Sequence, residues 1–405
     1  MQFKPIITKI KQYYYRSFIT RALFYAIISF LFLRLFSSFV LLIGFFQPSP
    51  VTPSSEISRE VLFNLENTSF FNKFFLAPWY RWDTTHYLEI ADFGYDFNFM
   101  NTAWPPLYPF LIKITDSLFS PTILAALIVS NIFFILGLEV FYLLTKEVFS
   151  EKMSKDSIFY LIFFPTSFFF VAGYSESIFL FLSIAVFIFL RRKKWLFAGF
   201  FCFLATITRV QGLILAIPIL YELILEFKVN GNFKIFIFNS ISSLYAPFSY
   251  GLFSLYVYFG LRYDWPWESL SENWYLHFGF PWDGLIGNIQ LLLGKSIEND
   301  LSPDLVKLLN LIIAILAIII LFKLRKKIPA SISIYGWIML FVAIGKLDDN
   351  NELVSVIRYV LTIFPIFWGF ALLIKQKYLK LTYFAVSIVL QIILLVYFYW
   401  WYWVA

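Results

Sequence analysis

The chain has 405 residues, of which 60% are hydrophobic, 22% are aromatic and only 14% are charged. Its mean hydropathy is +0.76, and a soluble domain of this size would not tolerate so apolar a surface. The formal net charge of +7 comes from Lys and Arg residues in short clusters between hydrophobic segments, which argues against a nucleic acid as partner. The composition therefore predicts a multi-pass protein whose surroundings are the lipid bilayer.

Segments long enough to cross a hydrocarbon core of about 30 Å recur along the chain, and the alternating pattern of a membrane β-barrel is absent. We therefore expect an all-α polytopic membrane protein, one transmembrane domain over residues 1–405, with about eleven crossings. Residues 105–146 have room for one crossing or two. The charges demand an odd number there, which a partial or interfacial helix over Pro106–Phe119 and one crossing would satisfy. The expected crossings are 21–46, 107–146, 157–173, 175–190, 195–209, 212–227, 234–260, 303–322, 329–346, 354–374 and 381–403.

Basic clusters set the expected orientation, because cytoplasmic loops carry an excess of Lys and Arg. Such residues precede the first crossing and recur at 191–194, 323–327 and 375–380. They place the N-terminus in the cytoplasm and two long loops, 47–105 and 261–302, on the outer side. Both loops are rich in Trp, Tyr, Asp and Pro, which is typical of helices that lie at the membrane interface. The first hydrophobic segment has no small-residue cleavage site, so we expect a retained span and not a removable signal peptide.

The stretch RWDTTHYLEIADFGY, Arg81 to Tyr95, is unusually polar for this chain. Its pattern predicts a helix from about Asp83 to Phe93, with Gly94 as the stop. A carboxylate at a helix start is stabilised in its ionised form by the backbone N–H groups, so Asp83 is expected to be a base at neutral pH. The pattern alone leaves two interpretations of Asp83: a simple N-cap or a group that performs chemistry.

Arg209 and Arg358 lie in or beside hydrophobic segments, where a charge facing lipid costs at least about 2.5–3.5 kcal/mol. Each therefore needs an anionic partner. Glu176 or the lipid head groups would satisfy them structurally, whereas a bound phosphate would give them a function, because guanidinium groups bind phosphate oxygens with paired hydrogen bonds.

Metal ligands are sparse in the sequence. The two histidines, His86 and His277, are expected to pack or to form hydrogen bonds, and Cys202 is the one cysteine. The neighbours Glu89 and Asp92 could bring a divalent cation to His86, but an acidic pair of the Asp-x-Asp type is missing, so this signal is weak. We predict no metal site.

The stretch RWDTTHYLEIADFGY, followed by NTAWPPLYPFL at Asn101–Leu111, resembles the PIG-V-like family of GT-C membrane glycosyltransferases, related to GPI mannosyltransferase II. Order, spacing and residue types agree over both motifs. The chain departs from the pattern at Trp104-Pro105, where an aromatic pair is more usual, and we expect no effect on the chemistry. Weaker similarities extend the resemblance over nearly the whole chain, at 163–177, 208–212, 280–282 and 358–367.

The resemblance implies a GT-C fold, a helical bundle whose first outer loop carries the catalytic Asp, here Asp83. It implies the transfer of a sugar, with mannose the expected one, from a polyprenyl-phosphate-sugar donor, usually with inversion, and with no certain cofactor. The acceptor would be a glycolipid, a glycan or a protein. Asp83 would be the general base, and Arg209 and Arg358 would bind the donor phosphate. We expect an extracytoplasmic site in a prokaryotic cell membrane rather than in the endoplasmic reticulum.

Other residues are expected to contact the substrates or to orient the groups that do. They are Arg81, Trp82, His86, Tyr87, Tyr174, Glu176, Gln211 and Tyr359. Two rival functions stay open: a transporter or flippase of lipid-linked sugars, and a non-catalytic subunit that binds them. Against the transporter, the charged groups gather on one leaflet and no inverted repeat is visible.

Overall fold

The structure is a computed structural model that describes residues 3–45, 56–293 and 303–404. These residues form helices joined by turns, with one ribbon of two short strands. The helices are α1 Phe3–Phe45, α2 Glu56–Thr68, α3 Asp83–Phe93, α4 Leu107–Asp116, α5 Thr122–Val148, α6 Glu151–Ile162, α7 Glu176–Arg191, α8 Trp195–Thr206, α9 Ala216–Asn230, α10 Phe233–Leu255, α11 Pro266–Glu272, α12 Pro281–Leu292, α13 Asp304–Leu324, α14 Ala330–Gly345, α15 Val356–Tyr359, α16 Pro365–Leu373 and α17 Lys377–Tyr399. The strands are β1 Leu276–Phe278 and β2 Lys346–Asp348.

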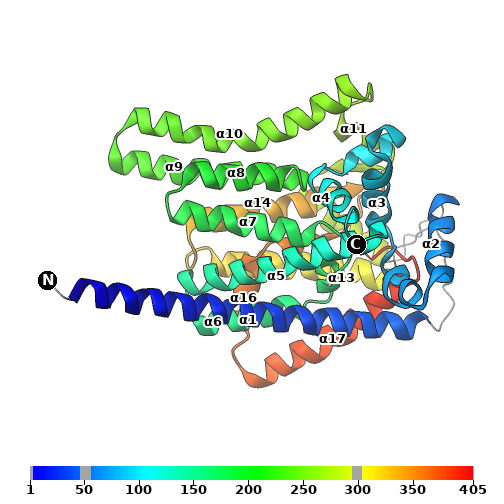
Figure 1. The fold of residues 1–405 in the computed structure, drawn as a ribbon, viewed down its shortest axis with the longest axis horizontal. Coiled ribbons are helices and arrows are strands. Elements are labelled where there is room, and N and C mark those ends of the chain that lie inside the picture. The colour runs from blue at the N-terminus through cyan, green and yellow to red at the C-terminus, as the bar shows by residue number, and fades with distance from the viewer. Residues whose placement is uncertain (1–2, 46–55, 294–302, 405) are drawn as a thin grey trace.

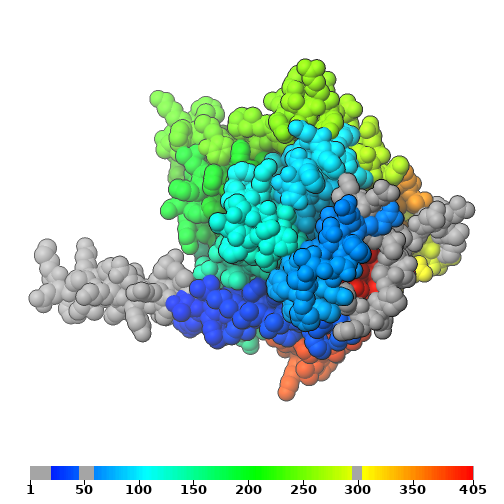
Figure 2. All heavy atoms as spheres, turned by 45° about the vertical axis from the view of Figure 1, so that its right-hand side comes forward, coloured from blue at the N-terminus to red at the C-terminus, as the bar shows by residue number. Residues whose placement is uncertain are grey.

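The long helices lie side by side as a bundle (Figure 1). Helix α5 packs between α1 and α7, and α8 packs between α7 and α10. Helices α2, α3 and α11 gather at one end, called here the loop end, and the turn from α7 to α8 with its basic run 191–194 lies at the other (Figure 1). In the space-filling view the blue and cyan residues of α2 and α3 lie at the surface of the loop end beside the yellow-green residues near 260 (Figure 2).

Five helical segments are long and apolar enough to cross a membrane. They are Thr20–Gly44, Thr122–Val148, Val210–Asn230, Asp304–Leu324 and Lys377–Tyr399. A sixth is possible if Val356–Thr362 and Pro365–Leu373 form one span, which is bent by 92°. The chain is thus an all-α, multi-pass membrane protein, as predicted, while the expected number of about eleven crossings stays a prediction.

Two of the expected spans are interrupted. Residues 157–173 were expected as one helix, but α6 ends at Ile162 and the chain continues through buried turns to Ser175. Pro165 explains the break, because proline lacks the N–H of a helical hydrogen bond and restricts the residue before it. Residues 354–374 bend at Pro365 for the same reason.

The expected partial helix before α5 is confirmed. Helix α4, Leu107–Asp116, has only 10 residues, which at 1.5 Å per residue is too short to cross a bilayer. A single long helix, α5, follows it with 27 residues. Residues 105–146 therefore contain one helix long enough to cross.

The two irregular segments, 163–175 and 353–364, lie against each other inside the bundle. Thr166 Oγ1 donates a hydrogen bond to the Ile357 carbonyl at 2.7 Å, and Arg34 Nη1 donates one to the Val171 carbonyl at 2.8 Å. Irregular backbone at membrane depth is tolerated only where it is buried in protein or lines a cavity. These contacts supply the backbone with partners and so hold the residues that follow each segment.

A ribbon joins the second long loop to the end of α14. Strands β1 and β2 are antiparallel, with Leu276 opposite Asp348 and Phe278 opposite Lys346. The sequence predicted helices in this loop, which α11 and α12 confirm, but it did not predict the ribbon. Helix α12 approaches the chain after β2 so closely that a Cβ on Gly287 would lie 2.2 Å from the Asn351 carbonyl oxygen, so only glycine fits there.

Candidate active site

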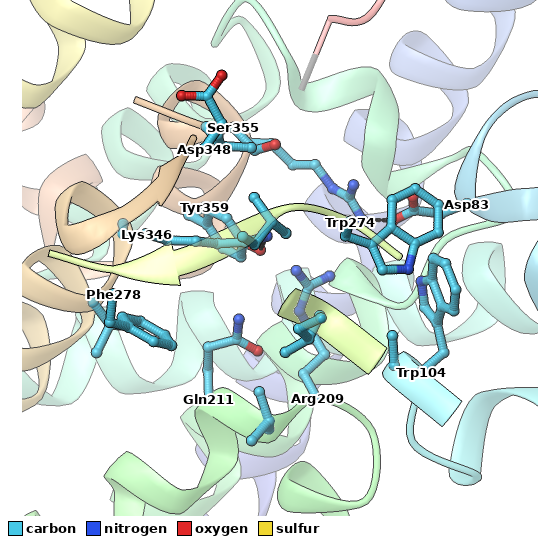
Figure 3. A pocket seen from close by; sticks show the side chains of 18 of the residues that line it. Asp83, Trp104, Arg209, Gln211, Trp274, Phe278, Lys346, Asp348, Ser355 and Tyr359 are labelled. Atoms are coloured by element: carbon cyan, nitrogen blue, oxygen red, sulfur yellow. Dashed lines mark hydrogen bonds and ion pairs between the residues drawn. The ribbon is translucent and has the colours of Figure 1, made fainter. Parts of the chain in front are cut away.

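A cavity of about 780 Å³ opens at the loop end. Its walls come mainly from residues within 82–105, 208–214, 267–278 and 339–359. Figure 3 shows Asp83, Trp104 and Trp274 on one side of this cavity. Lys346 and Tyr359 lie on the opposite side, and Arg209 lies between the two groups (Figure 3).

Helix α3 begins at Asp83, as predicted, and ends before Gly94, whose φ is +80°. The N-cap position is occupied by Trp82 and not by Asp83, so Asp83 is not a simple cap. Its Oδ2 instead accepts a hydrogen bond from Arg358 Nη2 at 2.6 Å. Burial by itself would raise the pKa of Asp83, but the guanidinium of Arg358 outweighs it and holds this pKa below its usual range. Asp83 is therefore an ionised carboxylate on the cavity wall at neutral pH.

Glu176 joins the two arginines. Its Oε1 accepts a hydrogen bond from Arg358 Nε at 2.5 Å and another from Arg209 Nη1, and its side chain is 1% exposed. Two carboxylates and two guanidinium groups thus form one chain of ion pairs, Asp83 to Arg358 to Glu176 to Arg209. Buried charges require such pairing, and the charges of these four residues sum to zero.

Lys346 adds a fifth charged group, which the sequence analysis missed. Its Nζ donates a hydrogen bond to Tyr359 Oη at 2.7 Å, and the Arg209 guanidinium lies 5.5 Å from the centre of the Tyr359 ring. Within the described residues, Lys346 has no carboxylate in ion-pair contact. The signal for it was a lone lysine at the outer end of the predicted span 329–346, opposite to the positive-inside tendency.

Aromatic rings cover the cavity wall beside Asp83. The Trp104 ring stacks on His86 with centres 4.2 Å apart, and Trp274 meets Trp104 edge-on at 5.1 Å. Burial lowers the pKa of His86 more than Glu89 raises it, so the imidazole is neutral at pH 7. His86 Nδ1 forms a hydrogen bond with Asn101 Oδ1 at 3.0 Å. His86 therefore supports Trp104 from behind.

The sequence-predicted site residues separate into three groups. The cavity is lined by Trp82, Asp83, Tyr87, Arg209, Gln211, Arg358 and Tyr359. Glu176, Tyr174 and His86 lie behind this lining, and the Tyr174 ring centre is 4.5 Å from the Arg358 guanidinium. Trp104 and Trp274 line the cavity as well although the sequence did not assign them to the site.

Arg81 lies outside the cavity lining. Its Nε donates to the Tyr399 carbonyl at 2.9 Å and its Nη1 to the Ala77 carbonyl at 2.8 Å. The guanidinium also lies against the rings of Tyr399 and Trp401. Arg81 therefore fastens α3 to the C-terminal helix.

No group of three or more His, Cys, Asp or Glu side chains in metal-binding geometry occurs among residues 3–45, 56–293 and 303–404.

The sequence profile of the family described as Mannosyltransferase (PIG-V) matches residues 19–264, more than half of the chain. A stretch of 157 residues is 29% identical to GPI mannosyltransferase 2 of Schizosaccharomyces pombe. That alignment covers 37% of this chain and 32% of the relative, so the chain matches about a third of the relative's length. No solved structure matches the chain.

The comparisons confirm the resemblance drawn from the sequence motifs. The family match ends at residue 264, so the weaker similarities at 280–282 and 358–367 stay predictions. The relative comes from a yeast, and the expected prokaryotic membrane therefore gains no support.

Proposed function

Because the chain belongs to the PIG-V family of mannosyltransferases, we propose that it transfers mannose from a polyprenyl-phosphate-mannose donor to a hydroxyl group of a lipid-linked glycan on the non-cytoplasmic side of its membrane. The observation that carries the proposal is the ionised carboxylate of Asp83, held by Arg358 on the wall of a cavity. The acceptor class is proposed from the name of the yeast relative, GPI mannosyltransferase 2.

The reaction is a displacement at the anomeric carbon. The acceptor oxygen forms the new glycosidic bond while its proton passes to an Asp83 carboxylate oxygen. The bond from the anomeric carbon to the phosphate oxygen breaks, and the polyprenyl phosphate leaves with the electron pair. In-line attack inverts the anomeric configuration. General-base catalysis of this kind contributes about 10²–10⁴-fold.

The charges of the cavity fit a donor with one negative charge. Arg209 and Arg358 are neutralised by Glu176 and Asp83, whereas Lys346 contributes a positive charge with only a tyrosine hydroxyl as partner. Lys346 and Arg209 therefore bind the phosphate and stabilise the charge that develops on it as the bond breaks. Arg358 extends this cationic surface to Asp83.

Apolar side chains provide a place for the polyprenyl tail. Met339 and Val342 of α14 line the cavity together with Leu213 and Ile214. The tail would leave the phosphate along this apolar wall and continue between the helices into the membrane. A long isoprenoid gains binding energy from each buried carbon, about 0.8 kcal/mol per CH₂.

The test is transfer by the purified protein in lipid nanodiscs, supplied with radiolabelled polyprenyl-phosphate mannose and a set of glycosyl inositol phospholipids. We expect a mannosylated product from the wild type and a loss of about 10²–10⁴-fold for Asp83→Asn. Asp92→Asn is the matched control, because Asp92 lies on the same helix but is exposed and bonded to Thr122. Wild-type rates from Asp83→Asn would refute the base, and a wild type that binds donor without transfer would favour the non-catalytic subunit.

A further inference from the structure

We propose that Trp82, Trp104 and Trp274 form a subsite that binds a pyranose ring of the acceptor, next to Asp83. The inference rests on the proposed function for the meaning of donor and acceptor. It assigns a ligand to the part of the cavity farthest from Lys346, and Trp274 lies beyond residue 264, where the family match ends.

The three indole rings present surfaces that suit a sugar. All three line the cavity, and Trp104 is held from behind by His86 and from the side by Trp274. Trp82 is held edge-on by Trp403, with ring centres 5.0 Å apart. Flat, immobilised indoles pack against the C–H faces of a pyranose at little entropic cost, because the rings do not have to be ordered on binding.

Two of these tryptophans also carry unused hydrogen-bond donors. The indole N–H groups of Trp82 and Trp274 are buried and have no partner in the protein, although buried indole N–H groups usually find one. An acceptor sugar offers hydroxyl oxygens that would accept these bonds. The same two residues thus supply stacking surface and polar contacts, the combination by which proteins recognise a sugar ring.

The backbone at Trp82 is strained. Its φ is +52° and its ψ is −125°, a conformation that a bulky residue rarely adopts. Strain of this kind persists only where surrounding contacts determine the geometry, and it concentrates at functional sites. Here it turns the Trp82 side chain to the cavity at the residue immediately before Asp83.

The position of the subsite identifies the acceptor. In a displacement with inversion the attacking hydroxyl and the leaving phosphate lie on opposite sides of the anomeric carbon. Figure 3 shows Trp104 and Trp274 on the same side as Asp83, with Lys346 and Tyr359 opposite. Asp83 must contact the acceptor hydroxyl and Lys346 the donor phosphate, so the aromatic side holds the acceptor ring.

The proposal is tested by binding, which does not depend on transfer. The protein in nanodiscs is photolabelled with diazirine-bearing octyl α-D-mannopyranoside and octyl β-D-glucopyranoside, each with and without an excess of the unmodified glycoside, and the labelled peptides are identified by mass spectrometry. Equilibrium binding of radiolabelled polyprenyl-phosphate mannose is measured in parallel. The variants are Trp274→Phe, which keeps a ring and removes the N–H, and Trp274→Ala. Trp282→Ala is the control, since Trp282 lies in the same loop, exposed and outside the cavity lining.

We expect competed labelling, with at least one of the two probes, in peptides that contain Trp82, Trp104 or Trp274. Glycoside affinity should fall about threefold in Trp274→Phe and about tenfold or more in Trp274→Ala, with donor affinity within about twofold of the wild type and Trp282→Ala unchanged. Labelling elsewhere, or a loss of donor affinity that equals or exceeds the loss of glycoside affinity, overturns the subsite. Failure of the proposed function is a separate result, because it appears as an absence of transfer while glycoside binding persists.

Discussion

Asp83 and Arg358 are 275 positions apart in the chain, yet Arg358 Nη2 lies 2.6 Å from Asp83 Oδ2. Arg358 reaches this position because its segment is held from two sides. Asn310 Oδ1 accepts a hydrogen bond from the Ile357 N–H at 3.0 Å and Asn310 Nδ2 donates to the Leu353 carbonyl at 3.0 Å. The candidate base therefore depends on a residue near the other end of the sequence for its charge state and its orientation.

Replacing Arg358 with Gln should shift the pH dependence of transfer. Burial raises the pKa of Asp83 and Arg358 lowers it, so without Arg358 the pKa of Asp83 rises. The base is then protonated at a higher pH, and the acid limb of kcat/KM moves upward from its wild-type position. The measurement is kcat/KM against pH for the wild type and the variant.

Arg209→Gln serves as the comparison, because Arg209 is the weakest of the influences on the Asp83 pKa. Its acid limb should move less than that of Arg358→Gln. An acid limb that stays in place in Arg358→Gln would show that Asp83 is not the titrating group.

Replacing Glu176 with Gln should destabilise the protein. Glu176 is buried and pairs two arginines, and removing one partner of a buried ion pair costs about 3–5 kcal/mol because an uncompensated charge stays behind. Thermal unfolding in detergent, followed by the loss of a monodisperse chromatographic peak, measures the effect.

The control for this change is Glu147→Gln. Glu147 pairs with Arg191 at 2.8 Å, but both side chains are about a third exposed or more, and exposed pairs contribute at most about 1 kcal/mol. We expect a clear fall in the melting temperature for Glu176→Gln and almost none for Glu147→Gln. Equal effects would contradict a structural role for the buried chain of ion pairs.

The sequence predicted the local features of the site well. Helix α3 begins at Asp83 and stops at Gly94 as expected, because helix starts and glycine stops are written in neighbouring residues. The pairing of Glu176 with Arg209 and Arg358 was also foreseen as an alternative, since a charge beside a hydrophobic segment needs a partner.

Features that depend on distant contacts escaped the sequence. Hydrophobicity over a window reads composition, and the segment 163–175 is as apolar as a helix although it folds into buried turns. The ribbon that places Lys346 opposite Phe278 pairs two short strands separated by more than 60 residues, and no local pattern specifies such a register. Lys346 and Trp274 were missed because both lie on the elements that this ribbon joins.

Replacing Arg81 with Met should lower stability without changing substrate binding. Arg81 donates to the carbonyls of Ala77 and Tyr399, and hydrogen bonds from charged groups contribute about 1.5–3 kcal/mol each. Met keeps much of the side-chain volume but makes none of these bonds. We expect a lower melting temperature, with KM for donor and acceptor unchanged. A raised KM at unchanged stability would instead support the sequence-based prediction that Arg81 contacts substrate.

Replacing Lys346 with Met should weaken the donor selectively. Its ammonium is the positive charge of the cavity that no described carboxylate pairs, so its removal leaves the phosphate with guanidinium groups that are already neutralised. A charge-assisted contact of about 1.5–3 kcal/mol corresponds to a rise of about 10–100-fold in KM for polyprenyl-phosphate mannose. Lys346→Arg keeps the charge and should retain most of the affinity.

Two further variants separate the charge of Lys346 from its structural contact. Tyr359→Phe removes the hydroxyl that Lys346 bonds but keeps the ammonium, so its effect on donor KM should be smaller than that of Lys346→Met. Lys380→Met removes a lysine that pairs with Asp156 at 2.6 Å and does not line the cavity, and it should leave donor KM unchanged. If Lys346→Met raised the KM of the acceptor and not of the donor, the phosphate would have to bind elsewhere, and the division of the cavity into a cationic donor side and an aromatic acceptor side would be wrong.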